Sequence, residues 1–187
     1  PDDGPPGGGG GRAAPRTTAT GLNRYTWDHT YNGPKNAQGV AADGGGPMAL
    51  PGKYTVKLLV DGKTSTQTLV VRADPRITKD GVTQADLTDQ FNHNTRARDL
   101  VSDVTRVVAR LREARTRLAR EQGNVAAADT LAKVRDIEAK LLTPPIRYST
   151  PGLQAHITYL YGMTARTDQK VGKDAKDRFT ELRAALN

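Results

Sequence analysis

The sequence predicts an α+β protein in which a small antiparallel β unit precedes a helical domain. Three observations carry this prediction: apolar residues recur at helical spacing through residues 84–187, two β-prone runs flank Asp61-Gly62, and most of the glycine and proline lies in the first 62 positions. We therefore expect a flexible glycine and proline linker over residues 1–16, a β unit over residues 17–76 and helices over residues 77–187.

Short runs of β-prone residues define the expected β unit. Residues 24–28 should form a first strand around Trp27, whose large apolar area suits the centre of a small core. Residues 53–60 alternate apolar and polar side chains, as a half-buried strand does, and Asp61-Gly62 then predicts a hairpin turn into a second strand. Glycine and proline in residues 31–50 indicate a long surface loop. The expected β core consists of Trp27, Tyr54, Val56 and Leu58.

Two helices are predicted with defined starts and ends. The first should begin after Thr83, an N-cap that forms a capping arrangement with Asp86, and should run to about Gln122. The second should cover residues 125–142 and end before Pro144-Pro145, because proline cannot continue a helix.

The third apolar stripe begins near Pro151 and keeps its phase across Gly162 and Gly172. We therefore expect one long helix, straight or kinked near Gly162, rather than two separate helices. Three apolar stripes of this length favour an antiparallel three-helix bundle after the β unit.

The chain carries a net charge of +8, and arginine is concentrated on the first predicted helix. The arginines there are Arg96, Arg98, Arg106, Arg110, Arg112, Arg115, Arg117 and Arg120. A basic helix can bind nucleic acid, but acidic residues such as Asp99, Asp103 and Glu113 are interleaved at helical spacing. This interleaving favours a solvated, ion-paired face and makes nucleic-acid binding the less favoured alternative.

Nothing in the sequence indicates a catalytic, cofactor-binding or metal-binding site. Cysteine is absent, which excludes disulfides, thiolate zinc sites and a cysteine nucleophile. His29, His93 and His156 lie in three different predicted elements without metal-ligand spacing, and the glycine runs are not followed by the Gly-Lys-Ser/Thr of a phosphate-binding loop. We expect a protein that is not an enzyme.

Four side chains are candidates for an interface. Ile146 and Tyr148 lie in a connection bounded by prolines, and either pack back onto the helices, which is the favoured alternative, or face a partner. Tyr159 and Tyr161 point to nearly opposite sides of the third helix, so at least one should lie off the core stripe.

Several short segments carry a resemblance to a known family. Gly21-Leu22-Asn23-Arg24-Tyr25-Thr26-Trp27-Asp28, Gly52-Lys53-Tyr54-Thr55-Val56 and Asp61-Gly62-Lys63 resemble the Ig-like β-sandwich of the flagellar hook-capping type. The continuation through Asp74-Pro75-Arg76, the long helix, Pro144-Pro145-Ile146-Arg147-Tyr148 and Leu160-Tyr161-Gly162 is similar to the C-terminal region of exported bacterial proteins built on BNR-repeat or sortilin-type β-propellers, often labelled glycosyl-hydrolase-like. The resemblance covers residues 20–187.

The resemblance implies a sandwich that is incomplete here, because a glycine-rich linker stands where earlier strands would precede residue 21. An exposed strand edge should then be covered by an upstream propeller or β-strand segment, or by another protein chain. Enzymatic labels belong to the propeller and do not extend to these residues. We read the chain, which opens at Pro1, as a piece of a longer polypeptide.

The expected function is that of a non-catalytic assembly or partner-binding module of an exported protein in the periplasm, at the cell surface or secreted. The alternatives are a basic nucleic-acid-binding module and an accessory subunit of a glycan- or peptide-active enzyme. No membrane span is expected, because no run approaches about 20 apolar residues.

Overall fold

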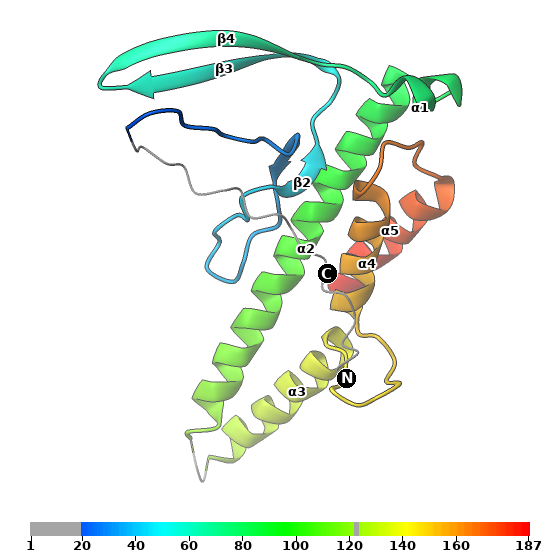
Figure 1. Cartoon of the computed structure of the whole chain (residues 1–187). Helices are drawn as coiled ribbons and strands as arrows, with labels where there is room; N and C mark the ends of the chain where they lie inside the picture. The colour runs from blue at the N-terminus through cyan, green and yellow to red at the C-terminus, as the bar shows by residue number, and fades with distance from the viewer. Residues whose placement is uncertain (1–19, 122–123) are drawn as a thin grey trace, which may run out of the picture.

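The computed structural model describes residues 20–121 and 124–187, so the linker expected over residues 1–16 lies outside the described residues. The protein is α+β, with two antiparallel two-stranded sheets followed by helices (Figure 1). Its elements are β1 (Thr30–Asn32), β2 (Gly45–Met48), β3 (Gly52–Val60), β4 (Lys63–Val71), α1 (Pro75–Lys79), α2 (Gln84–Leu118), α3 (Val125–Leu141), α4 (Leu153–Ala165) and α5 (Lys173–Leu186).

Helix α2 is the long axis against which α3, α4 and α5 pack (Figure 1). Its start is the predicted one, since the Thr83 hydroxyl accepts from the Asp86 N–H and the Asp86 carboxylate accepts from the Thr83 N–H. The core between the helices contains Leu100, Val104, Val108, Leu141, Ile157, Leu160 and Leu182. Because these residues come from four helices, no helix of the domain buries its apolar stripe by itself.

The small sheet β1–β2 lies on the helices. The Tyr161 hydroxyl donates to the Gly45 carbonyl oxygen at 2.8 Å, and the Lys35 N–H donates to the Ser102 hydroxyl at 2.9 Å. The ring of Tyr31 in β1 packs edge-on against the ring of Phe91 in α2. Gly46 permits the close pairing, since a Cβ there would overlap main-chain oxygens of β1. This sheet therefore shares contacts with the predicted helical unit.

The second sheet is the predicted hairpin, and it is confirmed. Strands β3 and β4 pair in register from Gly52↔Val71 to Val60↔Lys63. Asp61 and Gly62 have φ values of +47° and +76°, the two positive values that a type I′ turn requires. Unlike β1–β2, the hairpin packs against no other helix or strand of the described chain and extends away from the helices (Figure 1).

Three expectations for the β unit are wrong. Residues 24–28 are not a strand, because the first strand is Thr30–Asn32, and the loop predicted over residues 31–50 contains β2. Trp27 instead lies half-buried in an irregular segment just before β1, where its indole N–H donates to the Thr30 carbonyl oxygen at 3.0 Å. The side chains of Val56 and Leu58 are exposed rather than in a core. The described strands form two separate sheets, and a sandwich is not seen among them.

The second predicted helix is confirmed as α3, whereas the single long third helix is wrong. Gly162 is accommodated inside α4, and the chain leaves helical conformation after Ala165. Helix α2 stabilises the break. The buried side-chain amide of Gln90 donates to the carbonyl oxygens of Thr164 (2.8 Å) and Thr167 (2.6 Å). The Gln169 N–H in turn donates to the side-chain oxygen of Gln90. Carbonyls that a helix end leaves unpaired thus find partners on another helix. The short helix α1 was not expected.

Candidate functional site

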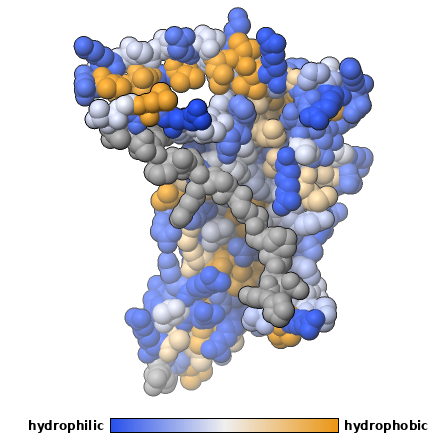
Figure 2. Space-filling model, viewed as in Figure 1, coloured by the Kyte–Doolittle hydropathy of each residue, from blue (hydrophilic) through white to orange (hydrophobic). Residues whose placement is uncertain are grey.

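One face of the hairpin presents a row of apolar side chains from β3 to solvent. In an antiparallel pair, opposite residues share a face and alternate residues along a strand change face. The register therefore places six apolar residues on one face, which we call the apolar hairpin face: Tyr54, Val56, Leu58, Val60, Leu69 and Val71. The β4 residues Lys63, Ser65 and Gln67 share this face, so its apolar side chains come mainly from β3. The exposed fraction is 52% for Val56 and 61% for Leu58. Apolar residues gather along the hairpin in Figure 2.

The opposite face of the hairpin is mainly polar. It carries Lys53, Thr55, Lys57, Thr64, Thr66 and Thr68 beside the apolar Leu59 and Val70. A hairpin with one apolar and one polar face is typical of a sheet that is covered on one side and solvated on the other. The described chain supplies no element that covers the apolar hairpin face.

The base of the hairpin is anchored while its remainder is free. The Tyr54 hydroxyl donates to the Leu50 carbonyl oxygen at 2.7 Å, and the Tyr54 ring packs edge-on against Trp27 with 5.5 Å between centroids. Desolvation raises the pKa of the Tyr54 hydroxyl. Of the four residues expected in the β core, Trp27 and Tyr54 are thus in contact at the base, and Val56 and Leu58 point outward beyond it.

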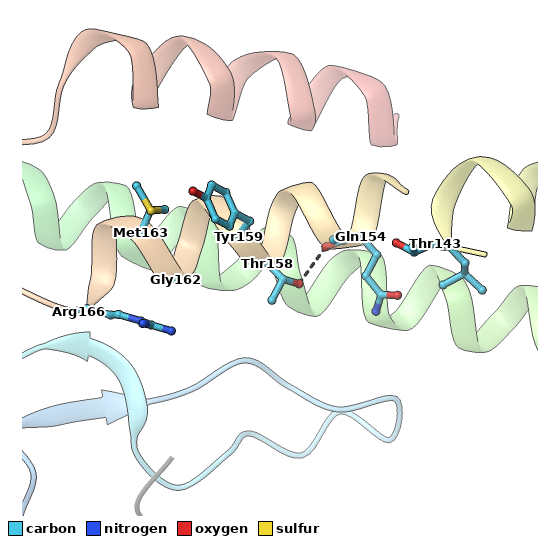
Figure 3. Close-up of a pocket in the computed structure, with 9 residues that line it drawn as sticks. Thr143, Gln154, Thr158, Tyr159, Gly162, Met163 and Arg166 are labelled. Carbon is cyan, nitrogen blue, oxygen red and sulfur yellow. Dashed lines mark hydrogen bonds between the residues drawn. The ribbon is translucent and has the colours of Figure 1, made fainter. Parts of the chain in front are cut away.

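A second exposed surface is an open groove of about 740 Å³ along α4. Tyr159 and Met163 stand on one side of the helix, and Thr158 and Arg166 lie on the other (Figure 3). Tyr159 is 67% exposed, so one of the two tyrosines lies off the core, as predicted. Tyr161 is buried, and burial raises the pKa of its hydroxyl to about 12. This tyrosine holds β2 to α4 and does not face solvent.

Ile146 and Tyr148 do not pack back onto the helices, and the favoured alternative is wrong for them. Tyr148 is 90% exposed, with the Arg147 guanidinium over its ring at 4.9 Å. The connection is closed at its neck, where the Gly152 N–H donates to the Thr143 hydroxyl at 3.0 Å. Because the neck is fixed, the residues between project as a small loop.

The arginines of α2 are partly ion-paired. Arg106 contacts Asp103 at 2.6 Å, and Arg115 contacts the buried Glu138 of α3 at 2.9 Å. Asp103 also accepts from Arg183 of α5. The Arg106–Asp103 pair supports the prediction of an interleaved, solvated face, and an exposed pair of this kind contributes little to stability. The Arg115–Glu138 pair instead joins α2 to α3 with a buried carboxylate.

The described residues contain no group of three or more His, Asp or Glu side chains that could hold a metal ion. His93 is fully buried against the ring of Phe179, with 5.8 Å between centroids. None of the described helices is both long enough and apolar enough to cross a bilayer.

Sequence reasoning missed part of the exposed surface. It assigned Val56 and Leu58 to a core and did not single out Leu69 or Val70, although the register implied by Asp61-Gly62 already places Leu69 beside Tyr54. Met163 was missed as well, although it follows Tyr159 by four residues, a spacing that puts both on one helix face.

A scan against protein-family models, a search of curated proteins and a search of solved structures each found no match to this chain.

Proposed function

We propose that the chain is a non-catalytic assembly module that binds β-structure of a partner through the apolar hairpin face. The observation that carries this proposal is a hairpin of two nine-residue strands whose apolar side chains are exposed and which no other described element covers. Exposed apolar surface of this extent is unfavourable in water and marks interaction sites in soluble proteins.

The partner fits the resemblance to the C-terminal regions of exported bacterial β-propeller proteins. The hairpin corresponds to the segments that resemble an Ig-like sandwich, Gly52-Lys53-Tyr54-Thr55-Val56 and Asp61-Gly62-Lys63. We infer that strands from an upstream part of a longer polypeptide, or from another exported chain, complete that sandwich. Assembly at the periplasm or cell surface would follow from such an origin.

Site-directed photo-crosslinking in the source cells tests this function. A photoreactive phenylalanine analogue replaces Leu58 on the apolar hairpin face, and in a matched control it replaces Lys57 on the opposite face. We expect the Leu58 position to give a dominant crosslink to a β-rich segment, identified by peptide mass spectrometry, and the Lys57 position to give at least about tenfold less. Equal crosslinking at both positions, or none at Leu58, contradicts the proposal.

Nucleic-acid binding through the exposed arginines of α2 is the second candidate. Arg110 and Arg117 lie on one exposed stripe of the helix and have no ion pair within the described part of the chain. Binding to duplex DNA that weakens steeply as salt rises would support it. Absence of binding at about 20 mM salt, well below physiological ionic strength, eliminates it.

A further inference from the structure

The two edges of the hairpin differ in charge. Strand β3 carries Lys53 and Lys57 on its edge, whereas β4 has no charged residue, proline or glycine between Thr64 and Val71. Soluble proteins protect edge strands from pairing with other chains by lysine or proline. By this criterion β3 is protected and β4 is open to pairing.

The main-chain groups of β4 are suitably placed for pairing. The two-residue turn makes Val60 and Lys63 the hydrogen-bonded pair next to it, and such pairs recur at every second residue of an antiparallel ladder. The N–H and C=O groups of Thr64, Thr66, Thr68 and Val70 consequently point away from β3. They have no partner strand among the described residues, because the sheet has two strands only.

The β4 edge is bounded by one cation at each end. Lys63 begins the strand and the exposed Arg72 follows it directly, and neither forms an ion pair within residues 20–121 and 124–187. At about 3.3 Å per residue, nine residues separate the two charges by about 30 Å. A segment that pairs along the whole strand therefore meets positive charge at both of its ends.

The positive charges at the two ends of β4 indicate which kind of strand could pair with it. In a symmetric antiparallel pairing of β4 with a second copy, each end of the joint would bring Lys63 of one copy within about one residue of Arg72 of the other, with the two side chains on opposite faces of the sheet. Positive charge at both ends of the joint and the net charge of +8 both contribute to repulsion between copies. A segment with a carboxylate at each end has the complementary charge.

We propose that the partner adds a strand to the free edge of β4, and that this strand is an extended segment with alternating apolar side chains and an acidic residue at each end. The inference rests on the proposed assembly function and specifies how the partner binds. Main-chain hydrogen bonds supply affinity, the apolar side chains extend the apolar hairpin face, and the terminal carboxylates fix the register against Lys63 and Arg72.

A synthetic strand tests the inference on the full chain. The probe is a fluorescent peptide of about ten residues, in which threonine and valine alternate between two terminal aspartates, so that the aspartates lie opposite Lys63 and Arg72. Fluorescence anisotropy should detect saturable binding. The same peptide with terminal lysines should bind at least about tenfold more weakly, and Lys63→Glu with Arg72→Glu should reverse the preference between the two peptides.

Two proline substitutions separate the edges. Thr66→Pro removes an outward N–H from β4, and Thr55→Pro removes the equivalent outward N–H from β3, while both leave the β3–β4 ladder its hydrogen bonds. We expect Thr66→Pro to weaken probe binding at least about tenfold and Thr55→Pro to change it less than about twofold. The reverse result overturns the choice of edge.

A modified probe tests the same point without altering the protein. N-methylation of every second residue removes the donors along one edge of the peptide, and we expect this probe to lose binding. Retained binding of the methylated probe overturns strand addition. A dimer in sedimentation equilibrium that Thr66→Pro dissociates would show that a second copy is the occupant and would also overturn the proposal.

The two proposals can fail independently. If Leu58 crosslinks to a β segment but probe binding is equal for Thr66→Pro and Thr55→Pro, assembly stands and strand addition at β4 is wrong. If Leu58 gives no crosslink in cells while the probe discriminates the two variants, the edge is competent for pairing and the proposed assembly function is wrong.

Discussion

At the residue scale, His93 is the most unusual side chain of the core. It is fully buried at the contact of α2 with α5, and within the described chain neither ring nitrogen has a hydrogen-bond partner. Desolvation, with a smaller contribution from the Arg96 charge, lowers the pKa of the His93 imidazole from its ordinary value of 6.5. Asp89 opposes this shift, and Lys176, which pairs with Asp89 at 2.6 Å, adds to it.

The depressed pKa of His93 predicts acid sensitivity. The ring of the unfolded chain takes up a proton first as the pH falls below about 6.5, so stability is complete above that value and decreases below it, by at most about 1.4 kcal/mol per pH unit. Urea unfolding at pH 7.5 and pH 5.0 measures the loss. His93→Leu should remove this part of the pH dependence, and an unchanged slope in that variant would refute the assignment to His93.

At the element scale, the hairpin is held by local signals and behaves as an independent unit. Its turn needs the positive φ of Gly62, and apart from the contacts of Tyr54 with Leu50 and Trp27 at its base it packs against no other described helix or strand. The helices differ in this respect, because α4 ends where the buried Gln90 and Asn94 of α2 donate to the Thr164 carbonyl oxygen. One element is thus specified by neighbours in sequence and the other by a neighbour in space.

Gly62→Ala should loosen the hairpin alone. An alanine at φ +76° costs about 1 kcal/mol, so exchange of the β3 and β4 amides should accelerate about fivefold while the α2 amides stay unchanged. Hydrogen exchange read by mass spectrometry measures both. Gly39→Ala, a substitution at a similar φ outside the hairpin, is the control, and acceleration of α2 exchange by Gly62→Ala would show that hairpin and helices are coupled.

At the scale of the whole molecule, the helices and the β1–β2 sheet form one packed body from which the hairpin extends (Figure 1). The body is joined by Leu100 at its centre, by the hydrogen bond from Tyr161 to Gly45 and by that from Lys35 to Ser102. The predicted boundary between the β unit and the helices therefore passes through a region of shared contacts.

Leu100→Ala should destabilise this body as a whole. The side chain is fully buried, and its truncation should lower the free energy of unfolding by about 2–5 kcal/mol, depending on how far the site collapses. Urea unfolding measures the loss, and the β1–β2 amides should lose protection together with the helical amides. Leu58→Ala on the hairpin should change stability by less than about 0.5 kcal/mol, and persistent protection of β1–β2 in Leu100→Ala would contradict a single body.

Features that depend on neighbouring residues could be predicted from the sequence. Thr83 and Asp86 define the start of α2, Asp61-Gly62 defines the hairpin turn and its register, and the double proline ends the region of α3, because capping and turn formation act over a few residues. The α+β class follows from these local signals.

Which apolar faces are covered and where the third helical segment breaks depend on tertiary contacts. The alternation of Val56 and Leu58 indicates that a face is to be covered, but not by what, and within this chain both side chains are exposed. The apolar spacing across Gly162 likewise continues past Ala165, although α4 ends there. The carbonyl oxygens of Thr164 and Thr167 accept hydrogen bonds from Gln90 of α2 instead of from a further turn of helix. Burial and long-range hydrogen bonding depend on residues distant in sequence, which a periodic pattern does not identify.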